Sequence, residues 1–219
     1  MSDFSKYKYR AFLSSSHTDR KSAEWLHQRL DRYNVDESLV GQQTPYGRVP
    51  NRLRPVFRDR EGLSAGPSLS SQIDEALTAS SALIVICSPS AVRSQHVQQE
   101  IKTFKRRGSN DRVFCFIVDG VPHDPHRNCL PAPLLTRFDP AGDPAGQDCD
   151  PLAADARPDG DGRELALSKI ISGLLGVPLT AIWRVSVKGS AGDTLESEWG
   201  AVIFQNLLTI FQQLITHIL

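Results

Sequence analysis

The chain carries no excess charge of either sign. Its 25 basic residues balance its 25 acidic residues, so no overall field draws the protein to nucleic acid or to an anionic membrane surface. The four cysteines follow no tight spacing, and the N-terminal segment contains no apolar stretch of the kind that a secretion signal needs. We therefore expect a cytoplasmic protein with free core thiols and without a nucleic acid partner.

Motifs of several enzyme classes are also missing. No strand-like run is followed by the glycine-rich loop of a P-loop or dinucleotide-binding protein, which argues against a kinase or a dehydrogenase. The serines at positions 14–16 lack the flanking glycines of a nucleophile elbow, so they do not indicate a serine hydrolase. Ser88 follows the central apolar run, where a phosphoreceiver domain needs an aspartate. The function must therefore be sought in other motifs.

One group of histidines and cysteines has the composition of a zinc site. His123, His126 and Cys129 recur at every third residue, with Cys115 and Cys149 farther away. A proline interrupts the group, and no finger-like spacing results. We therefore interpret these side chains as ordinary loop and core residues and expect no metal.

Apolar runs alternate with helical patterns along residues 1–182. Strands are predicted at 9–14, 54–58, 82–87 and 112–118, and helices beginning near positions 18, 68, 94 and 165. The run at 82–87 is apolar on both faces, which is typical of a central parallel strand covered by helices on each side. The alternation implies right-handed parallel crossovers and hence an α/β fold of three layers.

Two long segments lack such patterns. Residues 34–53 and 119–162 are rich in residues that break regular structure, so both are predicted to be irregular loops. The second is expected to contain a short edge strand near 151–157. A further loop is predicted at Ser88 and Pro89, before the helix that begins near position 94.

The C-terminal segment differs in kind, because residues 199–219 contain no formally charged side chain. Their length would permit a membrane span, but polar side chains line one side of the predicted helix and aliphatic side chains the other. We interpret the segment as an uncharged amphipathic helix that docks on its own domain or on a partner protomer, with membrane association as the alternative. The chain is thus divided into a domain (1–182), a linker (183–198) and this C-terminal helix.

Three segments resemble motifs of Toll/interleukin-1 receptor (TIR) domains of the bacterial kind. Residues 9–17 resemble the opening motif of that family, residues 57–66 its second motif and the loop beyond, and residues 88–101 its third, catalytic region. Each match alone is weak, but three in the right order over about 7–183 are specific. The resemblance implies a flavodoxin-like fold with a central parallel sheet of about five strands.

The resemblance also implies an activity. Many bacterial and plant members cleave NAD at the nicotinamide glycosidic bond and depend on a glutamate of the third helix, a position that corresponds to Glu100 here. A single carboxylate suits this reaction, because nicotinamide starts as a cation and leaves neutral without a proton from an acid. The carboxylate can stabilise the positive charge that develops on the ribose. NAD would then be a substrate, with no resident cofactor, in immune or defence signalling.

Further residues match positions that line the nucleotide cleft in the family. The candidates for substrate binding are Phe12, Ser14, Arg58, Asp59, Leu63 and His96. Phe12 has the alternative role of an ordinary core aromatic, and Arg58 with Asp59 that of a local ion pair. His96 stands where many active members carry tryptophan, four residues before the glutamate, and its smaller ring stacks less well.

The loop at residues 59–67 commonly packs against a neighbouring TIR domain in this family. The resemblance therefore implies a homo-oligomer formed by TIR–TIR contacts, in which two protomers complete the active site. A different function stays open, namely a TIR interaction module without catalysis that uses the same loop and the third helix. The surroundings of Glu100 bear on this choice, since an open cleft favours the enzyme and a closed carboxylate the scaffold.

Overall fold

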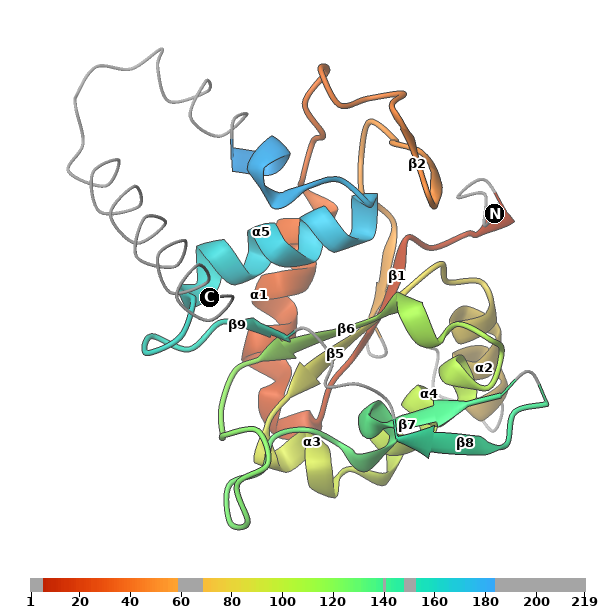
Figure 1. The fold of residues 1–219 in the computed structure, drawn as a ribbon, viewed down its shortest axis with the longest axis vertical. Helices are drawn as coiled ribbons and strands as arrows, with labels where there is room; N and C mark the ends of the chain where they lie inside the picture. The colour runs from red at the N-terminus through yellow and green to blue at the C-terminus, as the bar shows by residue number, and fades with distance from the viewer. Residues whose placement is uncertain (1–5, 59–68, 140, 148–152, 184–219) are drawn as a thin grey trace, which may run out of the picture. The chain divides into compact units, whose positions relative to one another are not determined.

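The computed structural model describes residues 6–58, 69–139, 141–147 and 153–183. Within them, five parallel strands form the central sheet in the order β4-β1-β5-β6-β9 (Figure 1). The strands are β1 (Ala11–Ser14), β4 (Val56–Arg58), β5 (Leu83–Cys87), β6 (Val113–Ile117) and β9 (Ala153–Asp155). The predicted flavodoxin-like α/β fold is thus confirmed.

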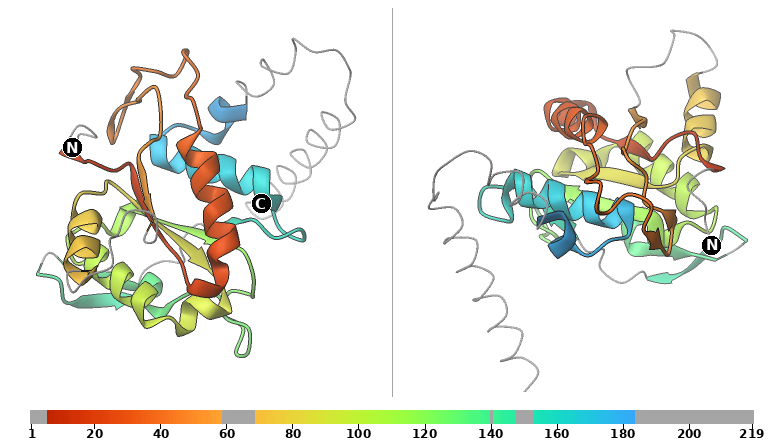
Figure 2. Two further views of the ribbon diagram at one scale, coloured as in Figure 1. Left: turned by 180° about the vertical axis from the view of Figure 1, so that it is seen from behind. Right: turned by 90° about the horizontal axis from the view of Figure 1, so that it is seen from above.

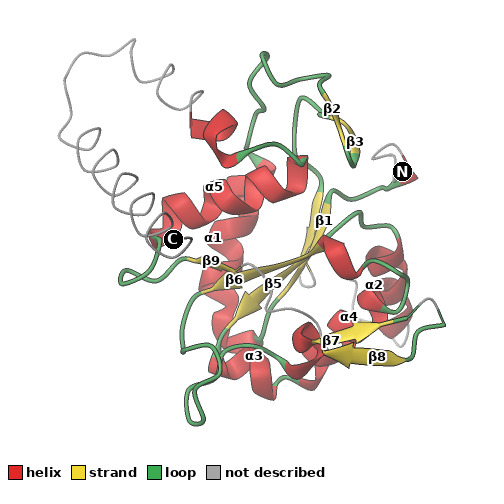
Figure 3. Cartoon of the chain, in the orientation of Figure 1, coloured by secondary structure: helices red, strands yellow, loops and turns green. Residues whose placement is uncertain are grey.

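Helices cover both faces of this sheet (Figure 2, Figure 3). On one face α1 (Arg20–Asp31) lies against β1 and β4, while α5 (Gly162–Leu175) lies against β6 and β9. On the other face α2 (Leu69–Thr78) packs beside α4 (Gln95–Lys105), and α4 contacts β5. The three layers expected from the sequence are therefore present.

The central strand β5 is buried on both faces, as its sequence predicts. Val85 and Cys87 are fully buried and belong to a core cluster with Ile101 of α4. Ile84 and Ile86 point to the opposite face, because side chains alternate along a strand, and they are fully buried as well. This burial holds β5 and its neighbours in register, with Leu13 opposite Ile84 and Val85 opposite Cys115.

The segment at Ser88 and Pro89 is not a loop but begins a short helix, α3 (Pro89–Arg93). The Ser88 side chain caps it by accepting a hydrogen bond from the Ala91 amide at 3.0 Å. Proline at the first helical position needs no donor there, which makes Ser-Pro a favourable start. The prediction missed this helix because five residues are too short to show helical periodicity.

The segment 119–162 contains more regular structure than its composition indicates. A 3-10 turn, η4 (Ala132–Leu135), leads into an antiparallel hairpin of β7 (Thr136–Phe138) and β8 (Pro144–Gln147). Asn110, in the turn η3 (Asn110–Arg112), donates to the Phe138 carbonyl at 2.8 Å and accepts from its amide at 3.2 Å. The predicted edge strand near 151–157 is confirmed as β9.

The segment 34–53 is mostly irregular, as predicted, but its tip is a two-residue hairpin. Its strands are β2 (Gln43–Thr44) and β3 (Gly47–Arg48). The hairpin packs beside the end of α5, where Gly176 caps the helix in the left-handed conformation with φ 71°. A Cβ at Gly176 would lie 2.7 Å from the Tyr46 ring, so both the conformation and the close approach require glycine.

Three cysteines, Cys87, Cys115 and Cys129, are free and buried. A hydrogen bond with Cys115 and the burial of the thiol keep the pKa of Cys87 well above its ordinary range. Burial likewise raises the pKa of Cys129 to about 11. The thiols of Cys87 and Cys129 are therefore protonated, and the three buried cysteines act as small apolar core residues, as predicted.

The division of the chain after residue 182 stays a prediction. Residues 184–219, which include most of the predicted linker and the whole uncharged segment, lie outside the described residues. Among the helices that the structure describes, none combines the length and the apolar character needed to cross a bilayer.

Candidate functional site

The order of the strands reverses between β1 and β5, which is where folds of this class open a crevice at the carboxyl edge of the sheet. One carboxylate bridges the two loops at this point. Asp19 accepts a hydrogen bond from Ser16, in the loop after β1, and another from the Ser88 hydroxyl after β5 at 2.6 Å. Because Ser88 also caps α3, Asp19 ties the starts of α1 and α3 together.

We expect the Asp19→Asn substitution to lower the free energy of unfolding by about 1–2 kcal/mol, because two charge-assisted hydrogen bonds become neutral ones. Chemical denaturation of the two proteins in parallel measures the difference. Asp124→Asn is the matched control, since Asp124 also accepts two hydrogen bonds, from the His126 and Arg127 amides, but in an exposed turn. The control should lose less stability than Asp19→Asn, because its carboxylate lies in an exposed turn and joins no distant segments, and equal losses in both variants would contradict a bridging role for Asp19.

Glu100 lies on α4, one helical turn after His96, at the same edge of the sheet. Its side chain is buried, with 6% of its surface exposed. The hydroxyl of Ser14, the last residue of β1, donates a hydrogen bond to Glu100 Oε2 at 2.5 Å. The carboxylate is therefore held against the end of the first strand, although the two residues are far apart in the sequence.

A cavity of about 140 Å³ opens beside these residues at the carboxyl edge. Its lining comes from the start of the first helical segment, the end of β4 and the start of α4. The lining residues are Ser15, Ser16, His17, Arg20, Arg58, Ser94 and His96. Among the described residues, this set contains two arginines and two histidines and no carboxylate, which favours an anionic group in the cavity.

The structure brings most of the predicted site residues together at this edge. Arg58 and His96 line the cavity, and Ser14 is buried against Glu100. Phe12 is fully buried in the core, where its ring stacks on that of Phe57 with centroids 5.2 Å apart, and it does not line the cavity. Asp59 and Leu63 lie outside the described residues.

Sequence reasoning did not single out the cavity residues that follow β1, His17 and Arg20 among them. The pattern there predicts only that a helix begins near position 18. The available signal was their position, because the residues that follow the first strand of such a sheet always reach its carboxyl edge. Arg20, the first residue of α1, directly follows the bridging Asp19 and contributes the second guanidinium.

Within the described part of the chain, no group of three or more histidine, cysteine, aspartate or glutamate side chains is placed to hold a metal ion. His123 is exposed in a turn, while Cys129 is buried. Cys149, the most distant member of the group considered above, lies outside the described residues. No geometry for a zinc site is therefore found there.

These features define a flavodoxin-like α/β domain with an arginine-lined cavity and a buried carboxylate at its carboxyl edge. The TIR domain family model matches residues 11–143, which is more than half of the chain, and the chain therefore belongs to the TIR domain family. None of the curated proteins compared with it matches. The family match ends in the β7–β8 hairpin, and β9 and α5 complete the same sheet and its helical cover.

Proposed function

We propose that this TIR domain cleaves NAD at the bond between nicotinamide and ribose, in immune or defence signalling. The observation that carries this proposal is the Glu100 carboxylate, held by Ser14 beside an arginine-lined cavity. A buried carboxylate at the ligand edge of the sheet is costly unless it is hydrogen-bonded, and such groups are concentrated at functional sites.

In the proposed reaction, the bond between ribose C1′ and the pyridinium nitrogen breaks, and its electron pair leaves with nicotinamide, which becomes neutral. Glu100 stabilises the positive charge that develops on the ribose. Ser14 acts as a positioning residue, because its hydroxyl restricts the orientation of the carboxylate. Attack of water on C1′ gives ADP-ribose and a proton, and attack by a nitrogen of the adenine gives a cyclic product.

The arginine-lined cavity would hold the diphosphate. Arg20 and Arg58 supply guanidinium groups, which pair well with phosphate oxygens. The volume of about 140 Å³ is below the roughly 300–1,000 Å³ of most small-molecule pockets, so the cavity suits a part of NAD rather than all of it. Domains of the TIR family interact through TIR–TIR contacts, and we propose that a second protomer supplies the remaining surface.

A second candidate function is a TIR interaction module without catalysis. The burial of Glu100 favours it, because the side chain is only 6% exposed and already accepts a hydrogen bond. His96 favours it too, since the imidazole at the mouth of the cavity offers less stacking area than an indole would. In this alternative Ser14 and Glu100 are a structural pair that joins α4 to the sheet.

The experiment that separates the two is an assay of nicotinamide released from NAD by the purified full chain at high protein concentration, with Glu100→Ala in parallel. If the domain is an enzyme, we expect the wild type to release nicotinamide and the Glu100→Ala variant to release none, although its circular dichroism spectrum is that of the wild type. Absence of release from folded protein that light scattering shows to be assembled would refute the enzyme and favour the interaction module.

A further inference from the structure

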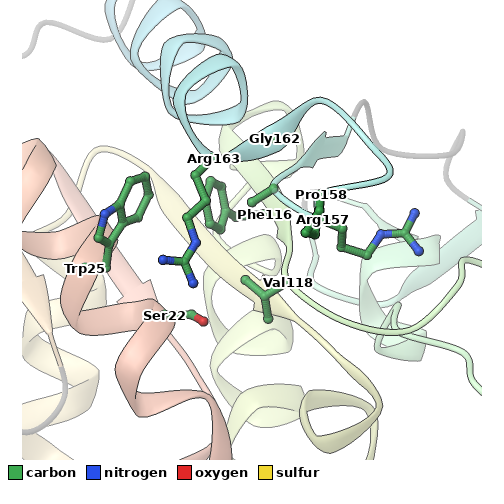
Figure 4. A pocket seen from close by; sticks show the side chains of 9 residues that line it. Ser22, Trp25, Phe116, Val118, Arg157, Pro158, Gly162 and Arg163 are labelled. Carbon is green, nitrogen blue, oxygen red and sulfur yellow. The ribbon is translucent and has the colours of Figure 1, made fainter.

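A second and larger cavity lies at the same edge of the sheet, near the opposite end of the strand order. Its volume is about 260 Å³, and it opens between α1, the ends of β6 and β9, and the start of α5 (Figure 4). It shares no lining residue with the cavity beside Glu100. An inference about it is therefore independent of NAD cleavage.

One wall of this cavity is apolar and aromatic. Trp25 of α1 stacks on Phe116 of β6 with ring centroids 6.2 Å apart and an interplanar angle of 25°. Phe116 is almost fully buried and Trp25 only in part, and Val118 continues the wall beyond β6. A partly exposed indole over an apolar floor offers a flat surface for a planar ring.

The mouth of the cavity carries a guanidinium. Figure 4 shows the Arg163 side chain descending from the start of α5 between Trp25 and Phe116, and its guanidinium carbon lies 5.5 Å from the centroid of the Trp25 ring. No acidic partner of Arg163 is found among the residues that the structure describes. The start of the 14-residue α5 adds the positive end of the helix dipole.

Three acidic residues around the cavity are paired. Arg157 forms two hydrogen bonds with Asp155, at 2.6 and 2.8 Å, which hold the pKa of that carboxyl below its ordinary value. Lys169 bonds both oxygens of Asp161, and Arg29 bonds Glu164 at 2.6 Å. Among the described residues, the cavity lining contains no carboxylate. The pairing of these three acids reduces the repulsion that an anion at Arg163 would meet.

We propose that this cavity is a binding site for a mononucleotide, with the phosphate at Arg163 and the base on the wall formed by Trp25, Phe116 and Val118. A nucleotide joins the two chemistries that the cavity offers, a planar ring and an anion, in one molecule. The volume of about 260 Å³ lies just under the range of about 300–1,000 Å³ for drug-sized ligands. The ligand would bridge α1 and α5.

The test is a calorimetric titration of the full chain with AMP at low ionic strength. We expect saturable binding, weakened at least about tenfold by Arg163→Gln because a charge-assisted hydrogen bond is lost. Adenosine and inorganic phosphate should each bind at least about tenfold more weakly than AMP. Adenosine has only the ring that would lie on the aromatic wall, and phosphate only the anion that would pair with Arg163. AMP should also shift the indole N–H resonance of Trp25, identified from the Trp25→Phe variant.

Two control variants make the result specific. Arg32→Gln removes the guanidinium of an exposed residue that follows α1 and does not line the cavity, so it should leave AMP affinity within about twofold of the wild type. Arg20→Gln alters the other cavity and should do the same. The proposal is overturned by the absence of saturable AMP binding, by an Arg163→Gln variant that binds as tightly as the wild type, or by loss of binding in Arg20→Gln alone.

Discussion

The Glu100→Gln variant is expected to lose at least about a hundredfold in the rate of nicotinamide release while remaining folded. Glutamine has the shape of glutamate and an oxygen that still accepts the Ser14 hydrogen bond, so the substitution removes the charge and little else. A neutral amide cannot stabilise a cationic ribose as a carboxylate does. The free energy of unfolding should stay within about 1 kcal/mol of the wild type, because removal of a buried charge offsets a weaker hydrogen bond.

Initial rates of nicotinamide release, measured beside a denaturation curve for each protein, test this expectation. Glu75→Gln is the matched control, since Glu75 is an exposed residue of α2 and its loss of charge should leave the rate unchanged. A Glu100→Gln protein with near-normal activity would show that the charge is not used in catalysis. If the Glu100→Gln variant is unfolded instead, we would assign Glu100 a structural role.

The Arg112→Met variant is expected to lose about 3 kcal/mol in the free energy of unfolding. Its guanidinium donates to the carbonyls of Gly173 and Leu174 in the last turn of α5, at 3.1 and 3.3 Å. It also donates to the Ser81 carbonyl before β5 and lies 4.0 Å from the centroid of the Tyr46 ring. Methionine fills a similar volume but leaves these buried carbonyls without a donor.

Burial lowers the pKa of Arg112 from its ordinary value, yet an arginine so affected remains charged at neutral pH. Urea denaturation provides the measurement. Arg106→Met is the matched control, because Arg106 is an exposed residue whose guanidinium carbon lies 5.7 Å from the Phe138 ring, and its loss should cost no more than about 1 kcal/mol. Equal effects of the two substitutions would contradict the anchoring role of Arg112.

The strands and long helices could be predicted because their signals are local. Residues 82–87 are apolar at every position, and a run of this length is typical of a strand buried on both faces, so the centre of the sheet could be predicted from these six residues. Some short elements could not be predicted. The hairpin β7–β8 and the helix α3 are too short for a period to be seen, and they form because Asn110 and Ser88 supply hydrogen bonds to them.

The position of Glu100 at the ligand edge followed from the order of the motifs, whereas its surroundings did not. Periodicity states which face of a helix a residue occupies, but not what packs over that face. The structure shows that the Ser14 hydroxyl donates a hydrogen bond to the carboxylate. It also shows that Arg20, at the start of α1, lines the nearby cavity and that Phe12 belongs to the core. Each of these results depends on contacts between segments that are distant in the sequence.

The sequence by itself determined the α/β class, the TIR family motifs and the placement of Glu100, His96 and Arg58 at one edge of the sheet. The class and the placement at one edge follow from local periodicity and from the rule that parallel strands end on the same side, and the family motifs from the resemblance of three segments. Only the tertiary structure decided that Asp19 bridges the loops after β1 and β5 and that Trp25 and Arg163 line a second cavity. Such sites form between side chains that are far apart in the sequence and close together in space. The pattern of residues along one segment does not show which of these side chains come into contact.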